Sequence, residues 1–126
     1  DATARRFIRN SMFSSDQDTY RIAAWILGRI GDQRDIPLLR AKLGASKDPA
    51  VDAYLNHSLA ALGDKAGLAA LAANLESEDG PIRTYAATFA GDAGATSVGP
   101  QLRKMLDDPH PDARYRAAQS LLFLAR

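Results

Sequence analysis

The chain has 126 residues, the usual length of one domain, and its 46% hydrophobic and 25% charged content is ordinary for a folded protein. With 16 Lys and Arg against 15 Asp and Glu, the net charge of +1 excludes a global electrostatic drive toward nucleic acid or membranes. The absence of Cys excludes disulfides, thiolate metal sites and Cys nucleophiles.

Localisation is constrained only weakly. No run of residues approaches the ~20 apolar residues that a membrane span needs, and no signal peptide is recognisable. Because the chain begins at Asp1 and not at Met, we expect that its start has been processed or trimmed and that any targeting segment is gone. We expect a soluble protein with no membrane partner and leave the compartment open, with the cytoplasm slightly favoured.

Residues 1–17 are expected to form the second helix of a truncated repeat. Ile8 and Met12 lie as far before Thr19 as Leu71 and Leu75 lie before Ile82. The first helix of this repeat is therefore missing from the sequence.

Residues 18–47 are predicted to form a helix pair. Its first helix runs from about Thr19 to Ile30, with Asp18 as the N-cap and Gly31 as a left-handed C-terminal residue. Apolar residues recur along it at steps of three and four, which gives one apolar stripe: Ile22, Ala23, Ile26, Leu27 and Ile30. The second helix carries Ile36, Leu39 and Leu43, with Pro37 in its first turn.

The same pair of helices returns in residues 48–78 and 79–107, and residues 108–126 supply one more first helix. The four first-helix segments start 32, 31 and 31 residues apart, at Thr19, Val51, Ile82 and Ala113. Leucines occupy the same offsets in the three second helices: Leu39 and Leu43, Leu71 and Leu75, Leu102 and Leu106. A fixed period in this range, helical throughout, predicts an all-α solenoid of antiparallel helix pairs in one repeat domain, residues 1–126.

The repeated phrase resembles the HEAT repeat, and more narrowly the short variety of about 31 residues found in phycobilisome-lyase-type proteins. The residues that carry the resemblance are Ala23–Ala24–Leu27–Gly28–Gly31–Asp32, Leu59–Leu62–Gly63–Asp64, Arg83–Ala86–Ala87 and Arg114–Ala117–Ala118. The resemblance implies bonds between the Asp and Arg residues of successive repeats, here Asp64 with Arg83. It also implies that the first helices form the convex face and the second helices line the concave face.

No catalytic or metal-binding constellation is recognisable. The two histidines, His57 and His110, have no carboxylate or second His at helical ligand spacing. The His-Glu dipeptides through which a HEAT-like di-iron hydroxylase family binds metal are absent, and the glycines stop helices rather than form a phosphate loop. We expect no enzyme, metal or cofactor, and a structural or exposed role for His57.

A basic stripe is the first candidate for partner binding. Arg9, Arg40 and Arg103 share one offset in the second helices, where the remaining repeat has Ala72; Lys42 and Lys104 lie nearby. These charges are either ordinary solvated side chains or a stripe that receives an acidic partner segment, because Arg pairs bidentately with carboxylates.

Trp25 and the last helix are the second candidates. The equivalents of Trp25 are His57, Thr88 and Gln119, so this position is expected to face outward. Trp25 either anchors a partner or covers the space of the missing first helix. The last helix lacks the polar outer face of a capping repeat, which favours a longer array or end-to-end self-association through this helix.

The leading hypothesis is a non-catalytic scaffold that presents a curved surface to a protein or peptide. One alternative, from the resemblance alone, is an accessory subunit that helps to attach a bilin to a phycobiliprotein. Another is binding of a nucleic-acid backbone along the basic stripe, which the balanced charge and the lack of interleaved aromatic residues disfavour.

Overall fold

The computed structural model describes all 126 residues and contains only helices. The α-helices are α1 (Ala2–Ser11), α2 (Gln17–Ile30), α3 (Ile36–Arg40), α4 (Pro49–Ala61), α5 (Lys65–Asn74), α6 (Gly80–Asp92), α7 (Gly99–Lys104) and α8 (Pro111–Leu124). Three short 3₁₀ helices, η1 (Gln33–Asp35), η2 (Thr96–Val98) and η3 (Met105–Asp107), adjoin α3 and α7. The predicted all-α solenoid is confirmed.

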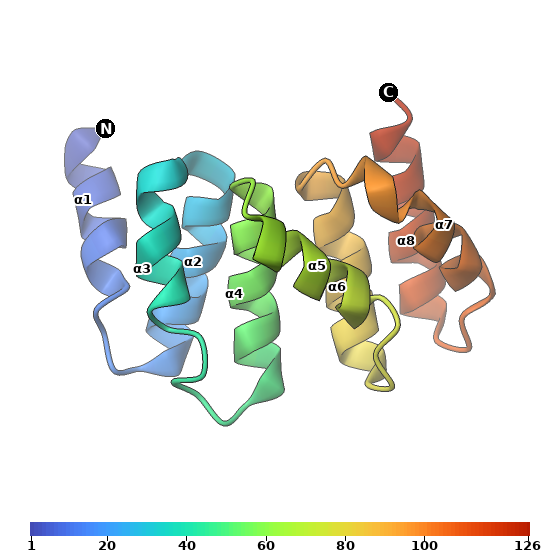
Figure 1. The fold of residues 1–126 in the computed structure, drawn as a ribbon, viewed down its shortest axis with the longest axis horizontal. Helices are drawn as coiled ribbons and strands as arrows, with labels where there is room; N and C mark the ends of the chain where they lie inside the picture. Colours follow the sequence, from blue (N-terminus) through green and yellow to red (C-terminus); the bar gives the residue numbers. More distant parts are fainter.

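The helices form two layers (Figure 1). The first helices, α2, α4, α6 and α8, lie side by side, and each packs directly on the next. The second helices, α3, α5 and α7, cover one side of this layer and scarcely touch one another, while α1 packs on α2 at the N-terminal end. The layer of first helices therefore holds the array together.

Aspartates are the N-caps of three of the four first helices. Asp16, Asp48 and Asp79 have extended backbones, and their side chains accept hydrogen bonds from backbone N–H groups in the first turns of α2, α4 and α6. The predicted cap Asp18 is wrong, because α2 begins at Gln17 and Asp18 lies inside its first turn.

Neighbouring first helices approach closely where a glycine faces a serine. A Cβ atom on Gly28 would lie 3.0 Å from Ser58 Cβ, and one on Gly91 would lie 2.9 Å from Ser120 Oγ. Ser120 Oγ also bonds across this contact, donating to Ala87 O and accepting from Gly91 N. Because helix separation follows the size of the side chains at the contact, α2–α4 and α6–α8 form two tight pairs.

Phe89 replaces the serine at the contact between α4 and α6. Its ring lies 5.3 Å from the Tyr54 ring and 5.2 Å from the His57 ring, centroid to centroid. The side chain is only 7% exposed, so it fills the space between the two helices. The two tight helix pairs are thus joined through an aromatic side chain.

The array curves toward the first helices. Arg29 of α2 reaches past α4 to Asp92 of α6, with 3.1 Å between Nη1 and Oδ2. The expectation that second helices line the concave face is therefore wrong. The physical reason is that glycine, alanine and serine bring the first helices close together, whereas the second helices are spread apart on the outside.

The leucines at equal offsets in the second helices differ in their burial. Leu39, Leu71 and Leu102 are completely buried, as their shared position predicts. Leu43 and Leu106 are 38% and 42% exposed, because α3 ends at Arg40 and the chain after Lys104 tightens into η3. Of these second leucines only Leu75, after the longer α5, is buried.

The residue that ends α2, Gly31, has to be a glycine for a steric reason. Its φ is −83°, so the predicted left-handed conformation is wrong. A Cβ atom there would lie 2.5 Å from both Asp35 Oδ2 and Leu27 O, which leaves no room for a side chain. Left-handed glycines occur instead in later turns, at Gly44, Gly63 and Gly94.

None of the helices combines the length and the hydropathy needed to cross a membrane.

The close contact between α6 and α8 gives a test of this packing. Replacing Gly91 with Val should lower the free energy of unfolding by about 1–3 kcal/mol, because the new methyl groups overpack against Ser120. Chemical denaturation measures the change. The matched control is Ala69→Val on the exposed side of α5, which should change stability by about 0.5 kcal/mol or less. Equal stabilities of the two variants would contradict the close contact.

Candidate binding surface on the concave face

The four first helices enclose a hollow on the concave face. Its volume is about 510 Å³, within the range of ligand pockets. All four helices contribute to its lining: Arg21, Ile22 and Trp25 from α2, Tyr54 from α4, Thr84, Tyr85, Thr88 and Phe89 from α6, and Asp112 and Arg116 from α8. A continuous surface therefore crosses the whole array.

Trp25 is one of the residues that line this hollow. Its side chain is 39% exposed and also lines a second, adjoining hollow with Gly28, Ser58 and Phe123. The Arg29 guanidinium lies 5.5 Å from the centroid of a Trp25 ring and is held there by its ion pair with Asp92. Trp25 thus faces the concave surface rather than the space beside α1.

Aromatic side chains form the floor of the hollow. The Tyr54 ring lies 5.2 Å from the Tyr85 ring and is covered by the Arg21 guanidinium at 4.9 Å. Arg116 has no acidic partner, and its only side-chain hydrogen bond is to Gln119 Oε1 at 3.3 Å. This arrangement can bury an apolar side chain and offers a guanidinium donor beside it.

Sequence reasoning found Trp25 but missed the residues around it. The apolar stripe predicted for the first helix includes Ile22 and Ile30, yet the two are 50% and 42% exposed. The buried side of α2 is formed by Tyr20, Ala23, Ala24 and Leu27. The spacing of Ile22, Trp25 and Arg29 places them on one helical face, which is the signal that could have identified this surface.

His57 lies behind the floor of the hollow and does not face outward, contrary to the expectation for its position. It is completely buried, with Nε2 accepting a hydrogen bond from Asn74 Nδ2 at 3.1 Å and no partner for Nδ1. Burial lowers the pKa of His57 from 6.5 to about 4, because desolvation penalises the charged ring. His57 is buried in part because Phe89 of the following repeat packs against its ring.

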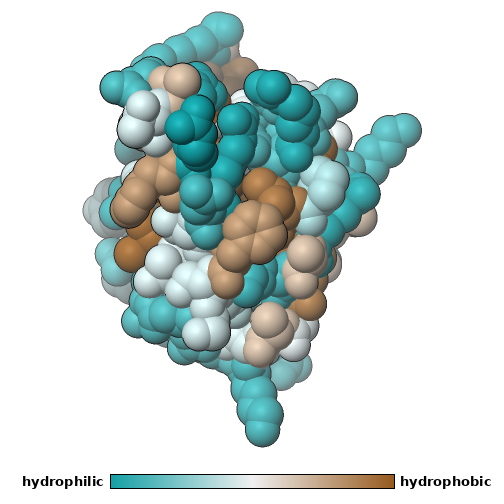
Figure 2. Space-filling view, turned by 90° about the vertical axis from the view of Figure 1, so that its left-hand side faces the viewer, coloured by the Kyte–Doolittle hydropathy of each residue, from teal (hydrophilic) through white to brown (hydrophobic).

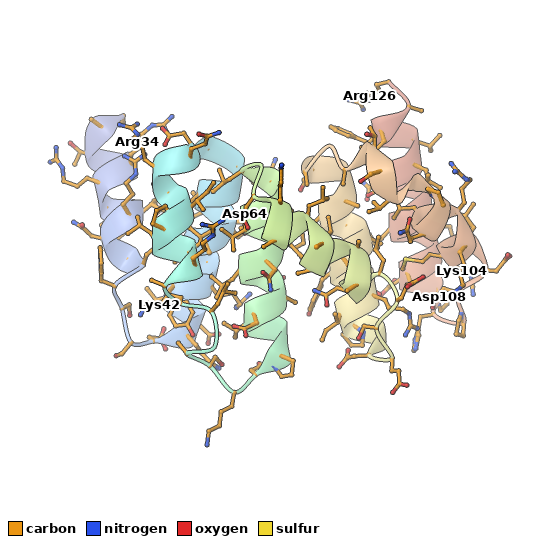
Figure 3. The ribbon with its side chains drawn as sticks, in the orientation of Figure 1. Arg34, Lys42, Asp64, Lys104, Asp108 and Arg126 are labelled. Atoms are coloured by element: carbon orange, nitrogen blue, oxygen red, sulfur yellow. The ribbon has the colours of Figure 1, made fainter.

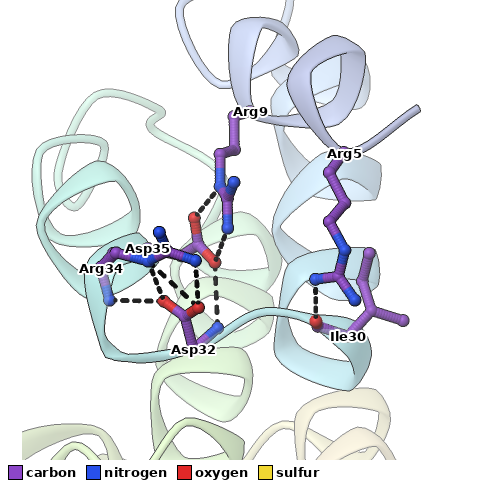
Figure 4. A network of polar contacts seen from close by, with 6 residues as sticks. All are labelled: Arg5, Arg9, Ile30, Asp32, Arg34 and Asp35. Atoms are coloured by element: carbon purple, nitrogen blue, oxygen red, sulfur yellow. Dashed lines mark hydrogen bonds and ion pairs between the residues drawn. The ribbon is translucent and has the colours of Figure 1, made fainter. Parts of the chain in front are cut away.

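Arg9, one of the predicted stripe residues, bonds to the next repeat. Its Nε and Nη2 donate to the Asp35 carboxylate at 2.6 and 3.3 Å. Asp35 also accepts from the backbone N–H of Asp32, so one buried carboxylate joins α1 to the turn after α2 (Figure 4). Within the same turn, hydrogen bonds from Arg34 lower the pKa of Asp32 to about 2.

Arg40 and Lys42 are also engaged within the chain. Arg40 donates to Asp64, the buried N-cap of α5. Figure 3 shows Asp64 at the start of α5. Lys42 Nζ donates to Ser14 O at 2.8 Å and lies 4.8 Å from the centroid of the Tyr20 ring. These three stripe residues therefore tie repeats together on the outer side of the array.

Arg103 and Lys104 differ from the other stripe residues in having no acidic partner. The Arg103 guanidinium folds back toward Gly99, and neither side chain takes part in an ion pair or side-chain hydrogen bond. In the remaining repeat Ala72 replaces the arginine, and Ala95 replaces the matching aspartate. Partner binding by the stripe stays a prediction, and it depends on these two residues at the end of the array.

The proposed pair of Asp64 with Arg83 is wrong. Asp64 binds Arg40 and the backbone N–H of Gly67, whereas Arg83 binds Asp108 of the following loop, with Nε 2.8 Å from Oδ2. This pair is mostly buried, and the hydrogen bonds from Arg83 lower the pKa of Asp108. Arg114 donates to Asp108 O, as Arg83 does to Ser77 O one repeat earlier.

No group of three or more His, Cys, Asp or Glu side chains is arranged to hold a metal ion.

Comparison with known proteins gives one finding: a family model described as HEAT repeats matches residues 5–91. No curated protein matches the chain.

Acid should destabilise the protein through His57. Its pKa is about 4 when folded and 6.5 when unfolded, so the unfolded state binds the proton first as the pH falls. The stabilisation from the neutral ring is complete above pH 6.5 and is lost toward pH 4, by about 3 kcal/mol. Denaturant unfolding of the wild type and of His57→Gln across this range measures the difference.

The control for this prediction is His110→Gln, which removes the exposed histidine. It should keep the pH dependence of the wild type, whereas His57→Gln should flatten it between pH 6.5 and 4. The same slope in all three proteins would mean that His57 is accessible to protons in the folded state.

Proposed function

Because the chain belongs to the HEAT repeat family, we propose that it is a non-catalytic interaction module that holds a segment of a partner protein or peptide on its concave face. HEAT repeats commonly act as scaffolds for protein interaction. The observation that supports this proposal is the hollow around Trp25, to which all four first helices contribute.

The lining of the hollow suits a segment with an aromatic or branched aliphatic side chain. Partly exposed aromatic residues in a concave setting are the usual anchors of protein interfaces, and Trp25 and Ile22 are both available. Arg116 supplies donors for a backbone carbonyl or a carboxylate of the same segment. The two hollows are lined by three arginines and two aspartates, so their net charge is small and apolar contact carries most of the affinity.

A second candidate is self-association through α8. Tyr115 and Leu122 are each 75% exposed, and Phe123 is 46% exposed, all on α8. Exposed apolar side chains in such a cluster mark interaction surfaces.

A library of random peptides displayed on phage tests the concave surface. Selection on the wild type should enrich peptides with aromatic or aliphatic side chains, and synthetic copies should shift the fluorescence of Trp25, the single tryptophan. Trp25→Ala should raise their dissociation constants at least about tenfold, as loss of an anchor residue does.

The matched control is the double variant Arg103→Ala/Lys104→Ala, on the outer side of the array. It should bind the selected peptides like the wild type. If the library instead yields acidic peptides that bind Trp25→Ala normally and lose affinity for the double variant, the binding surface is the outer stripe and the proposal is wrong.

A further inference from the structure

A smaller hollow adjoins the one that Ile22 and Tyr54 line on the concave face. Its volume is about 330 Å³, at the lower end of the range of ligand pockets. Trp25 and Phe89 line both hollows, so one bound segment can reach both. Arg29 and Asp92, in the last turns of α2 and α6, place the smaller hollow toward the C-terminal ends of the first helices.

Three aromatic side chains line the smaller hollow and form its walls: Trp25 from α2, Phe89 from α6 and Phe123 from α8. Trp25 and Phe123 are 39% and 46% exposed, so both offer ring surface to a ligand. Two small residues, Gly28 and Ala61, complete the apolar part of the lining. Because aromatic rings pack favourably on one another, these walls suit a ligand with an aromatic ring.

Ser58 is the most buried residue of this lining, at 1% exposed, and its Oγ has no hydrogen-bond partner. The serine that meets a glycine between α6 and α8 is bonded instead: Ser120 Oγ donates to Ala87 O and accepts from Gly91 N. A buried hydroxyl without a partner is unfavourable, so a ligand that bonds it removes this cost on binding. The free hydroxyl can both donate and accept.

A cation does not suit the smaller hollow, although aromatic walls often bind one. Asp92 is the one carboxylate of the lining, and it is already paired with Arg29, with 3.1 Å between Oδ2 and Nη1. The same guanidinium lies 5.5 Å from the centroid of a Trp25 ring. A cationic ligand would have to displace it from both partners. The favoured ligand is therefore neutral, with an aromatic body and a hydrogen-bonding group at its tip.

The exposed aromatic residues at the α1 end are in a different setting. Figure 2 views the molecule from this end, where hydrophobic side chains lie among hydrophilic ones. Phe7 and Phe13 are 69% and 72% exposed. Most of each ring is open to water, so a ligand on it would stay largely solvated. The concave face offers the better-enclosed aromatic site.

We propose that the smaller hollow receives a tyrosine side chain of the bound segment, with its ring against the three aromatic walls and its hydroxyl bonded to Ser58 Oγ. Phenylalanine would fill the same walls and leave the serine unbonded, and tryptophan carries its N–H on the side of a larger ring. This inference rests on the proposed function and adds the identity of one anchor residue of the partner.

Titration with p-cresol and toluene, the side-chain analogues of tyrosine and phenylalanine, tests the proposal. The indole N–H resonance of Trp25, the single tryptophan, reports binding in nitrogen-15 NMR spectra. The ratio of the toluene to the p-cresol dissociation constant should be about fivefold higher in the wild type than in Ser58→Ala, the effect of one neutral hydrogen bond. Thr88→Val in the larger hollow is the control and should keep the wild-type ratio.

The stability of Ser58→Ala separates ligand binding from a structural role. Because Ser58 Oγ bonds nothing within the chain, the variant should unfold at the same denaturant concentration as the wild type or at a higher one. Ser120→Ala, which removes two hydrogen bonds, should unfold at a lower concentration. Equal losses of stability in the two variants would mean that Ser58 is bonded within the protein, which overturns the proposal.

The other outcomes are equally distinct. An equal ratio in the wild type and Ser58→Ala, no binding of p-cresol, or a preference for tetramethylammonium over p-cresol each overturns the tyrosine site. The proposed function is judged separately by the peptide selection. Selected peptides that depend on Trp25 but carry no tyrosine keep the interaction module and overturn only the tyrosine site. Replacing the tyrosine of a selected peptide with phenylalanine should weaken binding about fivefold to the wild type and less to Ser58→Ala.

Discussion

The close approach of neighbouring first helices is the contact on which the architecture depends. Gly28 against Ser58 and Gly91 against Ser120 leave no room for larger side chains, so these helices lie nearer to one another than the second helices can. The difference in spacing between the layers bends the array toward the first helices. That bend brings Arg29 to Asp92 across α4 and encloses the hollow around Trp25.

Ion pairs connect successive repeats. Arg9 with Asp35, Arg40 with Asp64 and Arg83 with Asp108 each join a helix to a loop or turn of the following repeat. In each pair the carboxylate is buried, so removing its arginine would leave a buried charge without a partner. The middle of the array lacks the arginine and the aspartate together, at Ala72 and Ala95, and uses Phe89 packed on His57 and Tyr54 instead.

Periodicity predicted the helices and their buried leucines because Leu39, Leu71 and Leu102 recur at one offset and meet the same surroundings. It could not predict the direction of curvature, which depends on the relative size of residues in two layers. Nor could it show that Arg9 and Arg40 bind aspartates of the next repeat, since that depends on where the intervening helices end. The burial of His57 has a similar origin: its cover, Phe89, comes from another repeat.

The central claim, that the first helices line the concave face around Trp25, can be measured directly because Trp25 is the single tryptophan and the chain has no cysteine. A bimane fluorophore attached to Thr88→Cys on α6 should be strongly quenched by Trp25 at short range, since both residues line the same hollow. The same fluorophore on Ala69→Cys, on the exposed side of α5, should not be quenched. No quenching at residue 88 would mean that α2 and α6 are spread apart, with the first helices on the convex face, and would contradict the account.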